Sequence, residues 1–197
     1  MARGRREREL KRSRITVIGE GLTERWYFEH LRNLKGFRYD CKPRFFTHQS
    51  YIEMGKLIEQ VLQSGGIAVC ICDADITRNN ENERKRLEKI KSDYKKNERV
   101  FICDSMPSIE FWFLLHYLKT SKYFHSSEDV IKTLNKHLAG YNKQGNYLEK
   151  QQWVANLCEE NRLDKACTAA ESLPEGSQSY SLIYKAIRLF EENKLQQ

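Results

Sequence analysis

A chain of 197 residues is long enough for one domain of ordinary size, or for one domain with a helical addition. Because 40% of the residues are hydrophobic and 11% are aromatic, the chain is not intrinsically disordered, although 31% are charged and the net charge is +7 at pH 7. No apolar run is long enough to span a bilayer, and no apolar stretch of a secretory signal follows the basic N-terminus, so we expect a soluble protein of the cytoplasm.

Residues 1–13 form a basic arm that continues to Arg14. Clustered arginines and lysines favour a polyanionic partner, because their binding releases counterions from a phosphate backbone. Arg12 and Arg14 are therefore candidate nucleic-acid contacts. A solubilising tail explains the same cluster about as well.

Four short β-type runs then alternate with helical patterns, which predicts an α/β fold with a small, mostly parallel sheet of about four strands flanked by helices. The predicted strands cover residues 14–20, 42–47, 67–72 and 99–103. The first helix is expected to be capped by Thr23, and the next two are expected over residues 51–63 and 79–97. Because the third strand is almost continuously apolar, we expect it at the centre of the sheet, buried on both faces.

The apolar block 104–116 predicts a buried helix with Pro107 in its first turn. Only helical patterns follow, at residues 127–139, 149–160, 163–172 and 179–193. We therefore expect an α/β core over residues 14–118 and an all-helical part over residues 119–197 that packs on it. The six cysteines lack the spacing of a zinc site, so reduced and mostly buried thiols are expected.

Acidic residues fall where the predicted strands end. Glu20 ends the first strand, and Asp73 and Asp75 follow the third. The carboxyl ends of parallel strands open into the crevice where such folds bind ligands, and residues two apart in an extended chain project to the same side. Mg²⁺ prefers one or two carboxylates with water and phosphate, so the pattern predicts a magnesium site. By spacing alone, acids at these positions are more often turn or cap residues.

Four further residues are candidates for the same site. Glu24 lies in the first turn of its helix, where the helix dipole favours an acid whatever its function. Glu110 interrupts an apolar helix, so its carboxylate needs a partner. Lys143 lies in a polar loop and is either a solvated lysine or one that stabilises charge on a phosphate. Ser105 either contacts phosphate at a helix N-terminus or simply caps that helix.

Three motifs occur in order along the chain: IGEGLTE at residues 18–24, CDAD at 72–75 and SMPSIEFWFLLH at 105–116. Together they resemble the RloB-like branch of the TOPRIM superfamily, whose members carry a strand-ending Glu, a strand ending in D-x-D and an apolar helix of this type. Weaker similarity extends to residues 141–143, 170–171 and 179–189. The resemblance therefore covers most of the chain.

The resemblance implies a TOPRIM-like fold, with Mg²⁺ or Mn²⁺ bound by Asp73 and Asp75. It implies that Glu20 is a further ligand or a general acid/base in phosphodiester chemistry. The expected activity is that of a metal-dependent endonuclease acting on RNA, such as tRNA, or on DNA, in anti-phage defence by abortive infection. Glu24, Glu110 and Lys143 complete the candidate catalytic set.

Partners and rival functions follow from the same resemblance. The chain has no G-x-x-x-x-G-K-[ST] loop, so an ATPase partner would be a separate subunit. Self-association of the chain is compatible with the sequence. A non-catalytic nucleic-acid-binding or sensor subunit and a primase-type nucleotidyl transferase remain alternatives to the nuclease.

Overall fold

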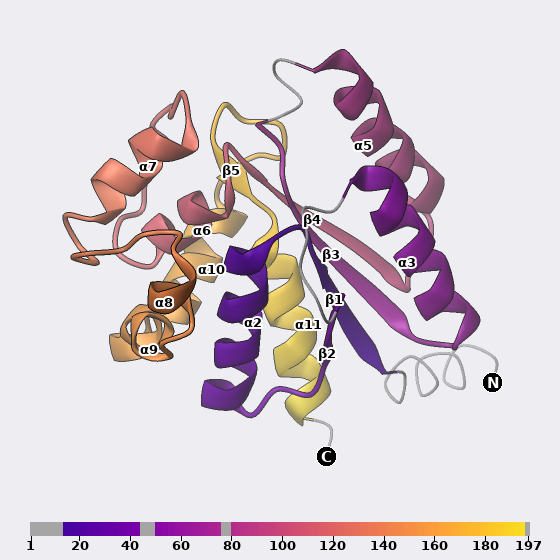
Figure 1. Ribbon diagram of the computed structural model, residues 1–197, viewed down its shortest axis with the longest axis horizontal. Coiled ribbons are helices and arrows are strands. Elements are labelled where there is room, and N and C mark those ends of the chain that lie inside the picture. The colour runs from indigo at the N-terminus through magenta and orange to yellow at the C-terminus, as the bar shows by residue number, and fades with distance from the viewer. Residues whose placement is uncertain (1–13, 44–49, 76–79, 196–197) are drawn as a thin grey trace.

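The structure is a computed structural model that describes residues 14–43, 50–75 and 80–195. Its sheet has five strands in the order β2-β1-β3-β4-β5 (Figure 1). The first four are parallel, and β5 runs antiparallel to β4. Their bounds are β1 Ile15–Gly19, β2 Asp40–Lys42, β3 Ile67–Asp73, β4 Val100–Met106 and β5 Tyr180–Ser181. The predicted α/β class with a mostly parallel sheet is confirmed, and residues 1–13, which include Arg12, lie outside the described residues.

Strand β3 lies between β1 and β4, and its side chains alternate between two cores. One set packs with helices α3 (Tyr51–Gln63) and α5 (Glu81–Tyr94) on one face of the sheet. The other set belongs to the larger core on the opposite face. The two sets are Ala68, Cys70 and Cys72, and Ile67, Val69 and Ile71. The strand is therefore buried on both faces, as its continuous apolar run predicts.

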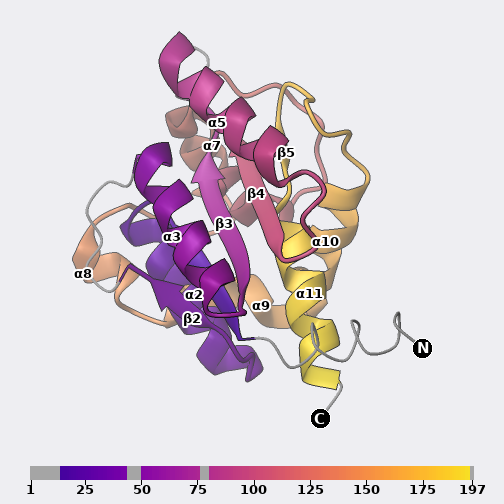
Figure 2. The ribbon, with the colours of Figure 1, turned by 90° about the vertical axis from the view of Figure 1, so that its right-hand side faces the viewer.

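The remaining helices lie on the opposite side of the sheet from α3 and α5 (Figures 1 and 2). They are α2 Leu22–Lys35, α6 Ile109–Leu115, α7 Ser127–Leu134, α8 Gly145–Leu148, α9 Gln152–Cys158, α10 Arg162–Glu171 and α11 Ile183–Leu195, with a 3-10 turn η1 at Glu159–Asn161. Helices α6 and α11 pack against β4, and α2 packs against β1. The C-terminal half thus covers one face of the sheet and supplies its fifth strand.

Two element boundaries differ from the prediction near the acidic residues. Helix α2 begins at Leu22, after Gly21, because the Gly21 N–H is satisfied by Glu24 Oε2 at 2.8 Å. Thr23 is therefore inside the helix and does not cap it. The predicted strand 42–47 is β2, which ends at Lys42, while residues 44–49 lie outside the described residues.

Strand β4 runs three residues beyond the predicted end because its last part has a second neighbour. The two terminal residues of β4 pair with β5, and the Asp104 carbonyl accepts the Leu182 N–H at 2.9 Å. Pro107 consequently precedes α6 and is not in its first turn, since Ser108 occupies the N-cap position. The predicted helix 179–193 likewise begins only at Ile183, because the two residues of β5 are extended.

All six cysteines are free thiols, and four of them are buried. The expectation that most of the thiols are buried is confirmed. In the described segments, no helix combines the length and the apolar character needed to cross a membrane.

Candidate active site

Two acidic residues meet where the neighbouring strands β1 and β3 end. Glu20 directly follows β1, Asp73 is the last residue of β3, and the two strands are paired up to Gly19 and Ile71. The backbone N–H of Asp73 donates a hydrogen bond to Glu20 Oε2 at 3.1 Å. The sequence prediction that these acids share the carboxyl edge of the sheet is therefore matched by their positions.

Asp73 is held from both faces of the sheet. Its Oδ1 accepts the backbone N–H of Ile109, at the start of α6, at 2.8 Å. Its carbonyl accepts the hydroxyl of Tyr51, at the start of α3, at 2.9 Å. Because an element from each side fixes this residue, the Asp73 carboxylate has a defined position relative to Glu20.

Glu110 lies on α6, and its side chain is fully buried. Its carboxylate accepts the Ser108 hydroxyl at 2.6 Å and the Tyr141 hydroxyl at 2.9 Å. Lys143 Nζ lies 3.1 Å from Glu110 Oε1 and forms an ion pair with it. These three groups are the partners that a carboxylate in an apolar helix requires, and two of them come from the C-terminal half of the chain.

The environment raises the pKa of the two acids at the strand ends. Burial raises the Glu20 pKa to about 7, and the charges of Glu24 and Asp75 add to this effect, although the Asp73 N–H opposes it. Burial raises the Asp73 pKa well above its ordinary value, and the charges of Glu24 and Glu110 raise it further. Burial and the neighbouring acids thus both disfavour the charged form of Glu20 and Asp73.

Glu24 and Lys143 belong to the same electrostatic group. Burial, together with the charge of Glu110, raises the Glu24 pKa to about 7. Burial alone would lower the Lys143 pKa, but the charges of Glu110 and Asp73 raise it, so the amine stays protonated near neutral pH. Lys143 thus places a positive charge beside several carboxyl groups.

The donor chemistry of this edge fits a divalent cation with few protein ligands. No three His, Cys, Asp or Glu side chains of the described residues are gathered tightly enough to hold a metal ion as they stand. Mg²⁺, however, uses one or two carboxylates and completes its shell with water and phosphate. Glu20 and Asp73 supply such oxygens, and a cation between them would offset the repulsion from the neighbouring carboxylates, which adds to the effect of burial on their pKa values.

Asp75 lies in the turn after β3, and its N–H donates to the Pro107 carbonyl at 3.1 Å. The prediction that Asp73 and Asp75 project to the same side assumes an extended chain. Because Asp75 lies in a turn, strand alternation does not determine the direction of its side chain. Asp75 still interacts with Glu20. Burial is the largest cause of the raised Glu20 pKa, and the charge of Asp75 raises it further. Asp75 thus remains a candidate ligand from the turn.

Neither of two predicted nucleic-acid contacts is placed to bind substrate beside the acids: Arg14 lies far from them, and Ser105, although it pairs with Asp73 across β3 and β4, is buried. Arg14 precedes β1, at the end opposite to Glu20, and forms an ion pair with Asp40 of β2. Ser105 is buried within β4, and its hydroxyl lies 2.8 Å from that of Ser181. The fold therefore shields Ser105 from a phosphate backbone, because β4 continues past the point where a helix was expected.

Three residues near the acids were not among the sequence candidates: Tyr51, Ser108 and Tyr141. Ser108 could have been found, because it lies two residues before a buried glutamate and precedes the helix. Tyr141 lies in the stretch of weaker similarity at residues 141–143, whereas no sequence signal points to Tyr51, and the hydroxyls of both tyrosines reach the acids only through the packing of α3 and of the loop before α8.

The family model described as RloB-like protein matches residues 15–188. No curated protein and no solved structure gives a significant match. The matched span covers most of the chain and includes Glu20, Glu24, Asp73, Glu110 and Lys143. The chain therefore belongs to the RloB-like protein family.

Proposed function

We propose that this chain is a metal-dependent nuclease that hydrolyses phosphodiester bonds in RNA, such as tRNA, or in DNA. The observation that carries the proposal is that Glu20 and Asp73 lie together at the carboxyl ends of β1 and β3. The Asp73 backbone N–H donates a hydrogen bond to Glu20 Oε2 at 3.1 Å. The raised pKa values of these half-buried acids and the family relationship support the proposal. The resemblance to TOPRIM proteins of phage defence suggests abortive infection as the setting.

In this proposal, Glu20, Asp73 and Asp75 hold Mg²⁺ or Mn²⁺. Such a cation, when bound, supplies an activated water and neutralises charge on the phosphate. Asp73 is suited to the role because Ile109 and Tyr51 fix it from two sides. The remaining coordination positions would be left to water and substrate oxygens, which Mg²⁺ favours over a cage made only of protein ligands.

The side chains themselves account for proton and charge control. A carboxyl with a pKa of about 7, such as that of Glu20, both gives and takes a proton near neutral pH, which suits a general acid/base. Lys143 is held 3.1 Å from Glu110 and stays protonated, so it can stabilise negative charge on a phosphate or leaving oxygen. Ser108 and Tyr141 keep Glu110 in place to position that lysine.

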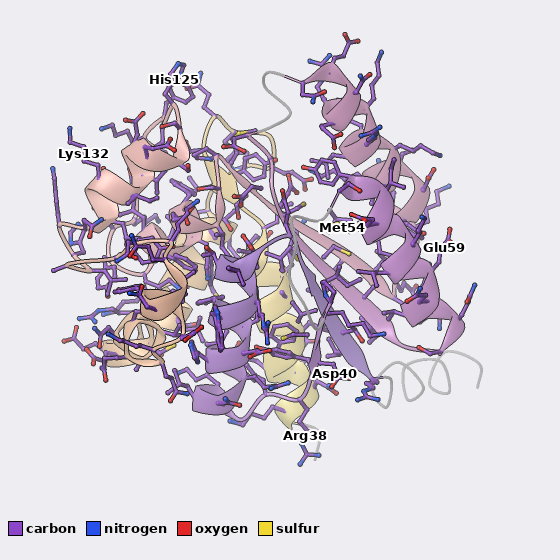
Figure 3. All side chains as sticks on the ribbon, viewed as in Figure 1. Arg38, Asp40, Met54, Glu59, His125 and Lys132 are labelled. Atoms are coloured by element: carbon purple, nitrogen blue, oxygen red, sulfur yellow. The ribbon has the colours of Figure 1, made fainter. Side chains whose placement is uncertain are left out.

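The test compares wild type with Glu20→Gln and Asp73→Asn on RNA, tRNA and DNA, in Mg²⁺, in Mn²⁺ and in a chelator. We expect metal-dependent cleavage by the wild type and a loss of about a hundredfold or more in Glu20→Gln, the range for general acid/base catalysis. The matched control is Glu59→Gln, an exposed acid on α3, which should cleave like wild type (Figure 3).

The same set of proteins is expressed in cells under phage challenge, where a separate ATPase subunit would be present. Cleavage that persists in chelator, or that is equal in Asp73→Asn and wild type, contradicts the proposal. Protection against phage that survives in both acid variants, with no cleaved nucleic acid, would point to the non-catalytic sensor subunit.

A further inference from the structure

A basic groove lies on the surface of the C-terminal half, between residues 122–125 and helix α7. Its cavity volume is about 360 Å³. The residues that matter for its chemistry are Lys122, Tyr123, His125, Asp129, Lys132 and Lys136. Figure 3 shows the side chains of His125 and Lys132 projecting from the surface on this side of the molecule.

The charge of the groove is predominantly positive. Three lysines line it, against the single carboxylate of Asp129. None of the three forms an ion pair with a residue that the structure describes, whereas lysines elsewhere, such as Lys89 with Asp93, are paired at 2.9 Å. Unpaired lysines that line one concave surface create a positive potential, so the groove is suited to an anionic ligand.

An exposed aromatic ring lies among these cations. Tyr123 is 42% exposed, and its hydroxyl lies 2.7 Å from His125 Nδ1, which restrains the ring. Proteins that bind an unpaired nucleic-acid strand usually combine lysines that contact the phosphates with aromatic side chains on which the bases stack. An inorganic anion has no base to stack on the ring, and the bases of a duplex are already stacked on one another. The ring therefore favours an unpaired strand over either of these ligands.

The groove lies toward the same end of the molecule as the acids. Figures 1 and 2 both place α7 and the carboxyl end of β3 toward one end of the fold. Helix α7 packs on α6, which carries Glu110 and whose first N–H holds Asp73. Because carboxylates repel a polyanion, positive charge near but outside the acid site favours the binding of nucleic acid, and the lysines of this groove carry such charge.

We propose that the groove binds an unpaired nucleic-acid strand, with Lys122, Lys132 and Lys136 on phosphates and Tyr123 stacked on a base, and presents it to the acids at the ends of β1 and β3. The presentation rests on the proposed nuclease function, whereas the binding does not. The inference names the form of the substrate, an unpaired segment of RNA or DNA, and the surface that selects it.

The test measures binding of a fluorescent single-stranded oligonucleotide by anisotropy, in an Asp73→Asn background so that the strand stays intact. We expect Lys132→Glu with Lys136→Glu to lower the affinity at least about tenfold and to reduce the slope of log K against log salt by about 1.4. Tyr123→Ala should lower the affinity by roughly fivefold to a hundredfold with little change in slope, because stacking is not ionic.

The matched control is Lys85→Glu with Lys89→Glu on α5, which makes the same change in net charge on an exposed helix where both lysines are already paired. It should bind better than the groove variant at every salt concentration. Equal loss in the two double variants, or preference for a duplex competitor with no effect of Tyr123→Ala, overturns the proposal. Similar thermal unfolding of all variants shows that loss of binding is not loss of fold.

Failure of this proposal is distinguishable from failure of the nuclease proposal. A wild type that binds through the groove but never cleaves refutes the nuclease and leaves the groove standing. A groove variant that binds and cleaves like the α5 control refutes the groove and leaves the nuclease standing.

Discussion

Two glutamates occupy equivalent places in two helices but have opposite environments. Glu24 and Glu53 are each the third residue of their helix, and each accepts the N–H of the cap residue, Gly21 at 2.8 Å and Ser50 at 3.0 Å. Glu24 is buried among other acids, and its pKa is raised to about 7. Glu53 is exposed, and hydrogen bonds from Ser50 lower its pKa.

We predict opposite pH dependences of stability for the two glutamine variants. Since the folded-state pKa of Glu24 is about 7, above its ordinary value of 4.5, its contribution to stability is present below 4.5 and is lost as pH rises through 7. The stability of Glu24→Gln relative to wild type should therefore increase over this pH window. The size of the Glu24 pKa shift corresponds to on the order of 3 kcal/mol. The measurement is the free energy of unfolding in urea with chelator, as a function of pH.

Glu53→Gln is the control, because the sign is reversed. A lowered pKa gives stability that is present above the ordinary value and is lost as pH falls through the folded-state pKa. This variant should be less stable than wild type near neutral pH and equal to it in acid. A Glu24→Gln curve parallel to that of wild type across the window would show that Glu24 is not held in a desolvated, acid-rich site.

At the scale of elements, the short strand β5 is joined to β4 by a buried charged residue. Asp104 is fully buried; its Oδ2 lies 2.8 Å from Lys91 Nζ and accepts the hydroxyl of Tyr180, the first residue of β5. Its Oδ1 has no hydrogen-bond partner in the described part of the chain. Asp104 therefore links α5, β4 and β5 at one point.

Tyr180→Phe removes one of the partners of this buried carboxylate and leaves the packing of the ring unchanged. We expect it to destabilise the protein by about 2 kcal/mol, because hydrogen bonds to charged groups contribute more than neutral ones. Tyr184→Phe on α11 is the control, with an expected change within about 0.5 kcal/mol, because its side chain is partly exposed. Chemical denaturation compares the two variants, and equal midpoints would mean that Tyr180 does not anchor β5.

The same elements show what the sequence could and could not predict. The periodic helix α3 was placed with its observed bounds, Tyr51–Gln63, and the apolar strand β3 was placed to within one residue. Strand β5 has only two residues, so its alternation cannot be recognised before the strand is seen beside β4. Acids at the ends of strands could be assigned to one edge from topology, whereas the pairing of Glu110 with Lys143 depends on how the C-terminal half packs.

At the scale of the whole molecule, the distribution of charge is uneven. The chain has a net charge of +7, yet Glu20, Glu24, Asp73 and Glu110 gather at one edge of the sheet. Burial is the largest cause of the raised pKa values of Glu20, Glu24 and Asp73, and the charges of neighbouring acids raise these values further. At a pH above the Glu20 and Glu24 pKa values of about 7, the carboxylates at this edge therefore repel one another and destabilise the fold. Any group that neutralises this edge should stabilise the whole protein.

This leads to a prediction in which one substitution has opposite effects with and without metal. In chelator, at a pH above those pKa values, Asp73→Asn should unfold at a higher temperature than wild type, because it removes one of the repelling charges while its amide oxygen still accepts the Ile109 N–H. Mg²⁺ at about a hundred times its dissociation constant should stabilise wild type by about 2.7 kcal/mol. Because Asp73→Asn lacks the carboxylate that would bind the cation, Mg²⁺ should stabilise this variant much less than wild type.

The order of unfolding temperatures therefore inverts between chelator and Mg²⁺, which simple loss of packing at position 73 would not produce. Glu59→Gln, an exposed acid, should follow wild type in both conditions. Sodium chloride at matched ionic strength separates specific binding from screening, because screening lowers the repulsion without a bound cation, so only a Mg²⁺ shift larger than the sodium chloride shift reports binding. An equal Mg²⁺ shift in wild type and Asp73→Asn would place the cation elsewhere, and the acids at the ends of β1 and β3 would then serve the fold alone.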